Sequence, residues 1–501
     1  MPLPRLLRPA GAAAFAFATT GAFLPMPASS LRLPPSALRL PSAPSAPLDT
    51  AIARMGGEET LRRIERVRFE MMTLWQRLTF ENRPSDLIGT YELHSDLRNY
   101  TLGAWRNTRR FLNGPTLREM TDIVQKDAGI RRIPNPDGTF APWAPINIAY
   151  IDERKEIFAF APERLLLAAR AASDLRALSD TSIAGLPHAR VAATIDGFPT
   201  TIFLRRNDGF LAMARYHAAQ PNDFGLAPWG DMEVEMWYSR WGKYPMPGTN
   251  GVGYPSQWDI RRVGHMYKRL TVLTANFDAA APADSFAISD SLRTVFASSS
   301  ASRPMWELPM DSAKIIEPRL ARFGNIGQAQ TAVKLGSQWL LLEGTGVPQR
   351  NETDLQWLAS ADAGSSVAGL LITVPNAGRG GAAWFASHTL PVYVAPGAAS
   401  ATAATLANWK QPRTAATVVT KPQWLRIGGD SLWLETIDYP DYAGALVAYV
   451  PSMRWVYSGL AASPLNLDLL AARIHERGWT VDRIGSARSL TQPGPGRTAS
   501  R

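Results

Sequence analysis

The sequence predicts a two-domain protein, with an α+β N-terminal half built on antiparallel sheet and an α/β C-terminal half. Its 501 residues are too many for one ordinary hydrophobic core. From Val67 onward, apolar residues recur at every second position, which is typical of half-buried antiparallel strands. After residue 303, strand patterns and helix patterns alternate instead, and this order favours sheets flanked by helices.

The first 48 residues precede the predicted folded part. Arg5 and Arg8 stand before the apolar stretch AGAAAFAFATTGAFL, and the small residues of PMPASS follow it, which is the order of a secretory signal peptide. We predict a signal peptide over 1–30, cleaved at about 28–30. The alternative, a retained membrane anchor, is disfavoured because the run is shorter and richer in alanine than a spanning helix. Residues 31–48 are rich in Pro, Ser and Ala and are predicted to form an extended linker.

The composition limits the cellular locations and the binding partners that we expect for this protein. A signal peptide predicts an exported protein, periplasmic or secreted, and the chain has no second apolar run that would make it transmembrane after cleavage. The chain has no Cys, which excludes disulfides, thiolate zinc sites and Cys nucleophiles. The net charge is +10, but the Arg residues are spread along the chain and rarely interleave with aromatics, so we do not expect nucleic-acid binding. A cell-envelope partner is the macromolecular interaction that this charge favours.

The N-terminal domain is predicted over 49–296. It begins with a helical pattern that the pair Gly56 and Gly57 interrupts, and strands follow from Val67. Three antiparallel strands are expected within 190–217, because Asp196-Gly197 and Asn207-Asp208-Gly209 are hairpin-turn signals. A further strand is predicted over 231–241, and PERLLLAARAASDLRAL, which starts at Pro162, is predicted to be a helix.

The length and spacing of the predicted strands in this half are similar to those of the curved-sheet carriers of lipoproteins, in which an unclosed barrel wraps a helix. That resemblance implies a curved antiparallel β-sheet with a helix, and an apolar ligand in the concave face. The alternative is that the apolar stripe forms only the core beneath the helix. The run Trp237, Tyr238, Trp241 and Tyr244 is either a binding lip or ordinary packing at strand ends.

The C-terminal domain is predicted over 310–490, after a linker at 297–309, and residues 491–501 are predicted to be a disordered tail. The stretch VAGLLITV is a nearly unbroken apolar strand, as expected when both faces are buried. A Gly pair after it opens a helix, and Asn351 is expected to cap another. Near the end, Ser463 and Pro464 begin a helix that Gly478 ends.

The element order around LLITVPNAGRGGAAWF, with DYAGALVAYVP, VYSGLAAS and VDRIGSA after it, resembles the metallo-β-lactamase fold family over about 310–490. The resemblance implies a four-layer αββα sandwich and hydrolase ancestry. It also implies a set of metal-ligand positions, and these are occupied here by Val374, Asn376, Gly378, Arg379, Asp441, Leu460 and Arg488.

These residues do not suit a zinc site. Val and Leu offer no lone pair, Gly offers only backbone, and Arg brings a cation to the place of a metal cation. Asp441 and Asn376 alone are too few ligands for a catalytic zinc. None of the six His pairs with another at ligand spacing, so we expect each to be a surface residue or a satisfied core residue: His94, His188, His217, His265, His388 and His475. We therefore predict no metal, no cofactor and no catalytic residue.

The candidate site is the vestigial cleft, where Asn376, Arg379, Asp441 and Arg488 are expected to converge. Two Arg in one cleft form a clamp for a carboxylate or phosphate. The alternative is that an Arg pairs with Asp441 and plugs the cleft. GSSVAG and GTNGVG lack the strand and helix context of a nucleophile or phosphate loop.

The sequence leads to one hypothesis about function and two alternatives. The first is an exported protein whose degenerate, zinc-free metallo-β-lactamase-like domain acts by binding, either of a small anionic or apolar ligand or of an envelope partner. One alternative is a hydrolase of that fold with an atypical active site. The other is an envelope carrier of lipid or lipoprotein whose functional part is the N-terminal sheet. The fold alone does not decide between them.

Overall fold

The computed structural model describes twelve segments of the chain, namely residues 45–76, 89–113, 116–135, 137–223, 225–307, 313–325, 328–344, 348–374, 379–440, 442–461, 463–487 and 492–494. The N-terminal half begins with helices α1 (Ala46–Arg54) and α2 (Glu58–Arg62), which are separated at Gly56 and Gly57, where φ is positive. This is the glycine break that the sequence predicts. The signal peptide and residues 31–44 of the predicted linker lie outside the described residues. Residues 46–48, which are also predicted to be extended linker, form the first turn of α1 instead.

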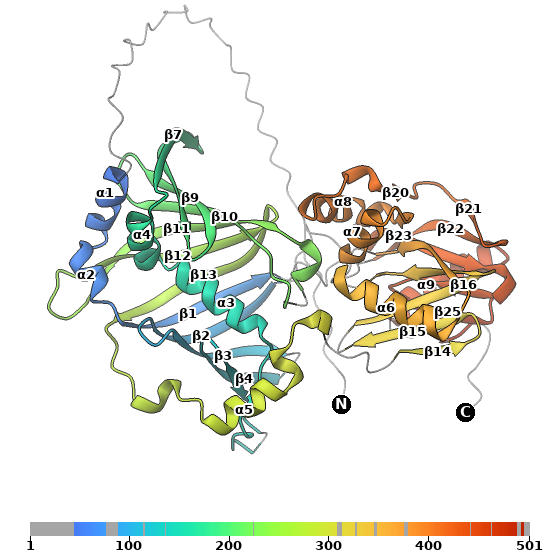
Figure 1. The fold of residues 1–501 in the computed structure, drawn as a ribbon, viewed down its shortest axis with the longest axis horizontal. Coiled ribbons are helices and arrows are strands. Elements are labelled where there is room, and N and C mark those ends of the chain that lie inside the picture. Colours follow the sequence, from blue (N-terminus) through green and yellow to red (C-terminus); the bar gives the residue numbers. More distant parts are fainter. Residues whose placement is uncertain are drawn as a thin grey trace, which may run out of the picture. The chain divides into compact units, whose positions relative to one another are not determined.

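A single antiparallel sheet of thirteen strands organises this half (Figure 1). Its spatial order is β6-β5-β4-β3-β2-β1-β13-β12-β11-β10-β9-β8-β7, so two meanders meet where β1 pairs with β13. The strands are β1 (Arg66–Gln76), β2 (Gly89–Asn99), β3 (Ala104–Asn113), β4 (Thr116–Val124), β5 (Gly129–Arg132), β6 (Ala144–Pro145), β7 (Arg176–Ile183), β8 (Leu186–Ile195), β9 (Phe198–Arg205), β10 (Leu211–Ala218), β11 (Met232–Tyr244), β12 (Val252–Arg262) and β13 (His265–Phe277).

The strands predicted from alternation are confirmed. Asp196 and Gly197 both have positive φ, as the tight turn between β8 and β9 requires. Along β11, Met232, Val234 and Met236 are buried, whereas Glu233 between them is exposed. The three strands expected within 190–217 are β8, β9 and β10.

Two helices, α3 (Ala149–Ala159) and α4 (Pro162–Ala171), lie on one face of this sheet (Figure 1). The helix predicted from Pro162 is confirmed at its start but ends at Ala171, because Arg176–Ile183 forms the edge strand β7. Leu165 and Leu166 of α4 share a core with Phe69 of β1 and Met236 of β11. Helix α3 covers a different part of the sheet, where its apolar residues Tyr150, Ile157 and Phe158 pack against Trp105 of β3 and Val124 of β4.

The connection to the C-terminal half is built of short helices rather than of extended chain. Helix α5 (Asp290–Ser298) is followed by the 3-10 turns η3 (Ser300–Ser302) and η4 (Met305–Glu307), within the linker predicted at 297–309. Backbone contacts group residues 43–501 into one compact unit, so the predicted domain boundaries stay predictions. Within the described segments, no helix is long and apolar enough to cross a membrane.

The C-terminal half holds two mixed sheets with helices. The first has the order β14 (Lys314–Glu317), β15 (Leu320–Asn325), β16 (Gln328–Leu335), β17 (Gln338–Leu342), β18 (Ser366–Ile372), β19 (Val392–Val394) and β20 (Ala416–Val418). The second has the order β21 (Gln423–Ile427), β22 (Asp430–Tyr439), β23 (Tyr442–Val450), β24 (Trp455–Tyr457), β25 (Arg483–Gly485) and β26 (Gln492–Pro493). The helices are α6 (Pro348–Ala361), α7 (Arg379–Ser387), α8 (Ala399–Asn408) and α9 (Pro464–Glu476).

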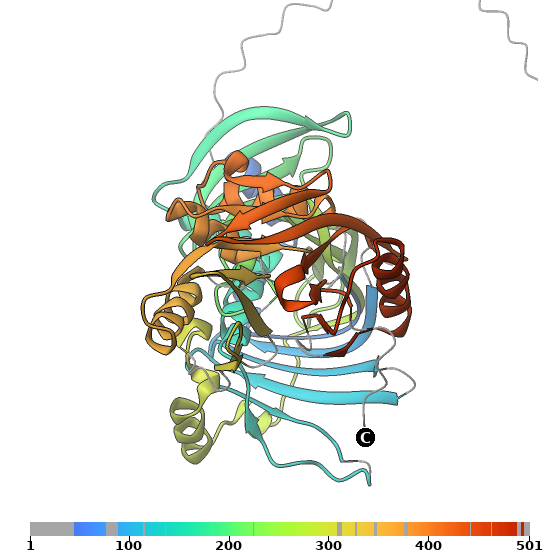
Figure 2. The ribbon, with the colours of Figure 1, turned by 90° about the vertical axis from the view of Figure 1, so that its right-hand side faces the viewer.

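These sheets lie between helices. Figure 2 shows them between α9, in dark red, and α6, in yellow-orange. Leu340 of β17, Leu434 of β22 and Phe385 of α7 belong to one buried cluster, whereas Leu470 of α9 packs with Val447 of β23 in another. The predicted buried strand is confirmed as β18, because Leu370 to Ile372 have no accessible surface.

Three local predictions for this half have different outcomes. The start of α9 is confirmed, since Ser463 caps the helix by accepting a hydrogen bond from the Asn466 N–H at 3.3 Å. The prediction that Asn351 caps a helix is wrong: α6 begins at Pro348, and Asn351 is buried inside it. The tail predicted at 491–501 includes β26, which pairs with β25.

We expect Phe160→Ala to lower the free energy of unfolding by about 3–5 kcal/mol, because it removes a large side chain from a filled core. Phe160 has no exposed surface and stacks on Tyr216 with 3.7 Å between ring centroids. Chemical denaturation checks this. The control Leu112→Ala, at a side chain that is 65% exposed, should change stability by no more than about 0.5 kcal/mol. Equal effects of the two substitutions would contradict this account of the core.

Candidate ligand-binding cavity

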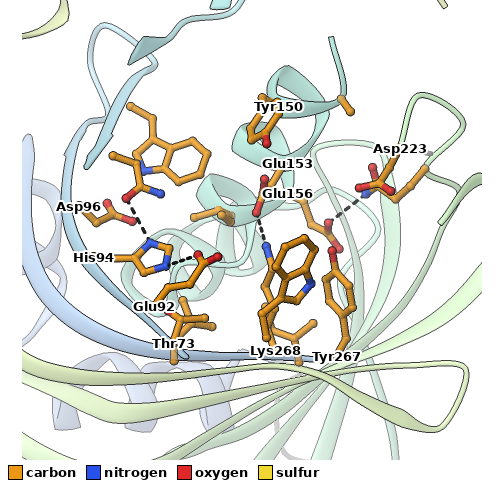
Figure 3. A pocket seen from close by; sticks show the side chains of 18 of the residues that line it. Thr73, Glu92, His94, Asp96, Tyr150, Glu153, Glu156, Asp223, Tyr267 and Lys268 are labelled. Carbon is orange, nitrogen blue, oxygen red and sulfur yellow. Dashed lines mark hydrogen bonds and ion pairs between the residues drawn. The ribbon is translucent and has the colours of Figure 1, made fainter. Parts of the chain in front are cut away.

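A cavity of about 430 Å³ lies between α3 and the large sheet (Figure 3). Strands β1, β2, β3, β12 and β13 line it from the sheet side, and α3 and the loop 220–226 line it from the other. Its volume is within the range of small-molecule sites. Its lining includes five carboxylates, four cationic side chains and one histidine: Glu92, Asp96, Glu153, Glu156, Asp223, Arg98, Arg109, Arg262, Lys268 and His94.

Strand β2 turns its charged face inward. Its residues alternate, so that Glu92, His94 and other polar side chains share the face toward the cavity. The apolar side chains Tyr91 and Leu93 between them are 63% and 53% exposed. The alternation predicts the strand correctly, but the buried face here is the charged one.

The first charged group joins β2 to β3. The Nε2 atom of His94 lies 3.1 Å from Glu92 Oε2, and its Nδ1 atom lies 3.1 Å from Asn107 Oδ1. Arg109 Nη1 is 3.9 Å from the same Glu92 oxygen. Burial alone would raise the pKa of Glu92, but the hydrogen bond with His94 and the charge of Arg109 outweigh it and lower that pKa. Glu92 is therefore ionised at neutral pH.

The second group is deeper. Arg98 donates to both oxygens of Asp96, at 3.0 and 3.1 Å, and the Arg98 and Asp96 residues are each 1% exposed. The Arg98 guanidinium lies over the rings of Phe69 and Trp258, with 5.0 and 5.5 Å to the centroids. This bidentate pair joins the polar and the aromatic parts of the lining.

Helix α3 supplies two carboxylates one turn apart. Glu153 accepts a hydrogen bond from Lys268 of β13 at 2.5 Å. Burial alone would lower the pKa of Lys268, but the charge of Glu153 more than offsets this and raises it. Burial likewise opposes ionisation of Glu153, yet the charge of Lys268 lowers its pKa. Both residues keep accessible surface, because they face the cavity.

Glu156 lies at one side of the cavity and accepts three hydrogen bonds. Its Oε2 atom accepts from Arg262 Nη2 at 2.6 Å and from Gln220 Nε2 at 3.0 Å, and its Oε1 atom accepts from the Tyr216 hydroxyl. Burial raises the pKa of Tyr216 well above its ordinary value, and the charge of Glu156 adds to the increase. These bonds connect α3 to three separate strands or loops of the sheet.

Asp223 differs from the other carboxylates because no cation of the described chain bonds to it. Its Oδ1 atom accepts from the backbone N–H groups of Gly225 and Leu226, at 2.7 and 3.0 Å. Burial raises the pKa of Asp223, and the charge of Glu153 raises it further, against the hydrogen bond from Gly225. The turn directs the second oxygen of Asp223 away from its own backbone.

The candidate residues predicted from sequence lie elsewhere. Asn376, Asp441 and Arg488 lie outside the described residues, and of Arg379 only its place as the first residue of α7 is described. Their convergence therefore stays a prediction. Trp237, Tyr238, Trp241 and Tyr244 are absent from the described lining of the cavity, and Tyr238 is buried with its hydroxyl bonded to the Phe160 carbonyl.

Two described positions do test the fit of a metal to the C-terminal half. Val374 is buried in the cluster of Tyr442 and Leu470, and Leu460 packs against that cluster. Neither side chain can donate an electron pair, so these positions do not fit zinc. No group of three or more His, Asp or Glu in the segments that the structure describes could hold a metal ion. The prediction of no metal stays a prediction.

Beside Val374 lies a buried carboxyl that the sequence analysis does not identify. Glu343 follows β17 and accepts hydrogen bonds from the Thr373 hydroxyl and, at 3.1 Å, from the Thr373 N–H. The Thr373 oxygen in turn accepts from the Gly459 N–H at 3.0 Å. Burial raises the pKa of Glu343 to about 8, so this carboxyl is largely protonated at neutral pH.

The expectation that every histidine is a surface or satisfied core residue holds in part. His388 lies at the end of α7 with its Nδ1 atom 2.9 Å from the Trp384 carbonyl oxygen. His94 has partners at both ring nitrogens, but it lines the cavity. The sequence does contain a signal for this site. In ELHSDLR, every second residue is ionisable: Glu92, His94, Asp96 and Arg98 share one face of the strand. A face that is merely exposed to solvent does not require four ionisable residues in succession.

Comparison with known proteins gives a fold likeness for part of the chain. No protein-family model matches it, and no curated protein matches it. A metallo-β-lactamase from Pontibacter korlensis is 15% identical and covers 36% of this chain and 92% of its own, with a TM-score of 0.29. The metallo-β-lactamase DIM-1 is 13% identical over 38% of this chain and 92% of its own, also with a TM-score of 0.29.

A third solved structure is the stereoselective inverting sec-alkylsulfatase Pisa1 from Pseudomonas sp. It is 10% identical and covers 36% of this chain and 39% of its own, with a TM-score of 0.28. A structural match to the metallo-β-lactamase fold therefore spans about 36% of the chain. At these identities and scores the match says nothing of activity.

We expect Arg98→Met to destabilise the protein by about 3–5 kcal/mol, because it leaves the buried charge of Asp96 without a partner. The double variant Arg98→Met with Asp96→Leu should recover most of that loss, since it removes both charges. Urea denaturation of the single and double variants provides the measurement. A double variant as unstable as Arg98→Met would show that the stability comes from packing of the Arg98 side chain.

A second prediction concerns pH. The unfolded chain ionises Glu343 near its ordinary pKa of 4.5, whereas the folded protein keeps the proton up to about pH 8. Ionisation therefore stabilises only the unfolded state between these values, and the free energy of unfolding should fall as pH rises through this window. Glu343→Gln removes this ionisation. Between pH 5 and pH 8, the free energy of unfolding of the wild type should therefore fall by about 3–5 kcal/mol more than that of the variant.

Urea denaturation at pH 5 and pH 8 measures this difference. Glu352→Gln, at an exposed position of α6, is the matched control and should alter the difference by no more than about 0.5 kcal/mol. An unchanged pH dependence in Glu343→Gln would contradict the protonated state of this carboxyl.

Proposed function

We propose that this protein is an exported binding protein and that its ligand site is the cavity between α3 and the large sheet. The observation that carries the proposal is a cavity of about 430 Å³ whose lining carries paired charges. In this proposal the C-terminal half is a degenerate, zinc-free αββα domain of the metallo-β-lactamase type. Export rests on the signal peptide predicted over 1–30.

Stability alone does not account for this lining. Removing paired charges from water costs free energy, and apolar residues of similar volume would serve a structural core at least as well. Yet Glu92 and Glu156 are 6% and 3% exposed, and both lie beside accessible space. Charged groups that are kept around a cavity, with shifted pKa values, are typical of a functional site.

The directions of the pKa shifts favour binding over acid–base catalysis. A catalytic acid or base needs a pKa near the working pH. Here the pKa values of Glu92 and Glu153 are lowered and that of Lys268 is raised, so all three hold a constant charge at neutral pH. Both ring nitrogens of His94 already have partners, which leaves neither free to take a proton from a substrate.

The two alternatives from the sequence have less support. An envelope carrier of lipid needs an apolar groove, and burying acyl chains against ionised Glu92, Glu153 and Lys268 would leave these charges desolvated. An atypical hydrolase of the metallo-β-lactamase fold needs ligands where Val374 and Leu460 stand. An anionic ligand or an envelope partner at the C-terminal cleft is a separate proposal, which rests on the four residues predicted there.

We expect Ala149→Trp to block ligand binding, because Ala149 begins α3 and lines the cavity, so that an indole there would fill the space. The matched control is Lys155→Trp, which places the same ring at an exposed position of the same helix. Saturation-transfer NMR with 2-phenylethylamine, 2-phenylethanol and 3-phenylpropionate, each at millimolar concentration, provides the measurement.

At least one probe should bind the wild type and the Lys155→Trp variant, and its signal should be lost in Ala149→Trp. If no probe binds the wild type, or if Ala149→Trp binds as the wild type does, the cavity is not the ligand site.

A further inference from the structure

We propose that the ligand of this cavity is an organic cation, of the class of ammonium or amidinium compounds, and that Glu92, Glu153 and Asp223 recognise its charge. This inference rests on the proposed function, since it names the chemical class that the same site takes. Four features of the lining support it.

The first feature is a set of carboxylate oxygens without partners. Glu92 bonds through Oε2, Glu153 through Oε1 and Asp223 through Oδ1, and no described residue donates to the other oxygen of any of them. None of these three second oxygens is among the described buried atoms that lack a partner, so each keeps accessible surface. Glu92 is only 6% exposed, so the surface of its free oxygen is surface of the cavity.

The positions of these groups differ enough to enclose a ligand. Glu92 extends from β2 and Glu153 from α3, and their side chains reach toward the same space from opposite walls (Figure 3). Asp223 comes from the loop before η1 (Ala227–Trp229). Because the described acidic groups include no set of three close enough to hold a metal ion, the three carboxylates suit a larger, polyatomic cation.

The second feature is the balance of charge. The lining has five carboxylates and four cationic side chains, and each of the four cations already contacts a carboxylate. Asp223 is the carboxylate left without one. The charges of Glu92 and Glu153 both act on Lys268, and the charge of Lys268 acts on Asp223, so three carboxylates share one ammonium. A bound cation would supply the missing positive charge.

The third feature is the state of the arginines, which argues against an anionic ligand. Arg98 and Arg262 each have an Nη1 atom without a hydrogen-bond partner in the described part of the chain. These atoms have almost no accessible surface, so a ligand in the cavity cannot meet them. These two arginines therefore offer few free donors to a carboxylate or phosphate, whereas the three carboxylates offer free acceptors.

The fourth feature is the aromatic lining. Lys268 lies over the rings of Trp75 and Tyr267, with 5.7 and 5.3 Å to the centroids, and Arg131 lies over Tyr150 at 4.8 Å. Aromatic faces attract cations and repel anions because of the ring quadrupole. These rings line the same cavity as the three carboxylates, so its apolar surface also favours positive charge.

Isothermal titration calorimetry at pH 7 with three probes of matched size tests the inference. 2-Phenylethylamine is a cation at this pH, 2-phenylethanol is neutral and 3-phenylpropionate is an anion. We expect the amine to bind at least about tenfold more tightly than the alcohol, and the propionate to bind more weakly than the alcohol, since a complementary buried charge contributes an order of magnitude or more.

Charge-removing variants then identify the groups responsible. Asp223→Asn and Glu92→Gln should each weaken amine binding about 5- to 20-fold and leave alcohol binding within about twofold. No cation in the described part of the chain bonds to Asp223, so its variant remains informative if Glu92→Gln fails to fold. Glu233→Gln, an exposed carboxylate on β11 that is absent from the lining, is the matched control and should change neither affinity.

The outcomes separate this inference from the function on which it rests. Suppose that Ala149→Trp blocks binding of the alcohol or the propionate, but the amine binds no more tightly than they do. The cavity is then still the ligand site, and the proposal that its ligand is a cation is wrong. Equal weakening of all probes by Asp223→Asn would also overturn it, since that is a structural effect. If Ala149→Trp affects no probe, both proposals fail.

Discussion

The N-terminal half depends on ion pairs that α3 makes with the inner face of the large sheet. Glu153 and Glu156 lie one turn apart on this helix, and they bond to Lys268 of β13 and Arg262 of β12. A helix with an apolar stripe could rest on the sheet by hydrophobic contact alone, as α4 does through Leu165 and Leu166. Helix α3 is held both by these ion pairs and by apolar contacts of Tyr150, Ile157 and Phe158 with Trp105 and Val124, and the cavity lies between it and the sheet.

Much of the fold follows from the sequence, and the reason is local chemistry. Glycines at Gly56 and Gly57, the Asp196-Gly197 turn and the Ser463-Pro464 helix start each adopt the backbone that their residue types favour. Alternation predicts β8 to β11 for the same reason. Where neighbouring propensities compete, the prediction fails: DLRAL continues the helical spacing of α4 but pairs with β8 as an edge strand.

The cavity could not be predicted in the same way. Alternation along β2 predicts two faces but not which one is buried, and the usual assignment would place Leu93 inside and Glu92 outside. The structure reverses this, because partners for Glu92 and Asp96 come from β3 and from Arg98 on the strand itself. Helix α3 is not predicted from the sequence, because the charged run 152–156 separates its apolar residues Tyr150 and Ile151 from Ile157 and Phe158. The four residues predicted for the C-terminal cleft rest on a family likeness, and none of their side chains is among the described ones.

The pairing of β1 with β13 joins residues as distant in sequence as Val67 and Phe277 at the centre of one sheet, where the two meanders meet. Synthesis delivers the chain from its N-terminus, so Glu153 and Glu156 of α3 emerge 115 and 106 residues before their partners Lys268 and Arg262. Until Arg262 and Lys268 arrive, the first meander has an open edge at β1, and Glu153 and Glu156 of α3 lack the cations to which they bond. The cavity is therefore a late product of folding: a nascent or truncated chain that ends before Arg262 has the carboxylates of α3 but neither of these two cations.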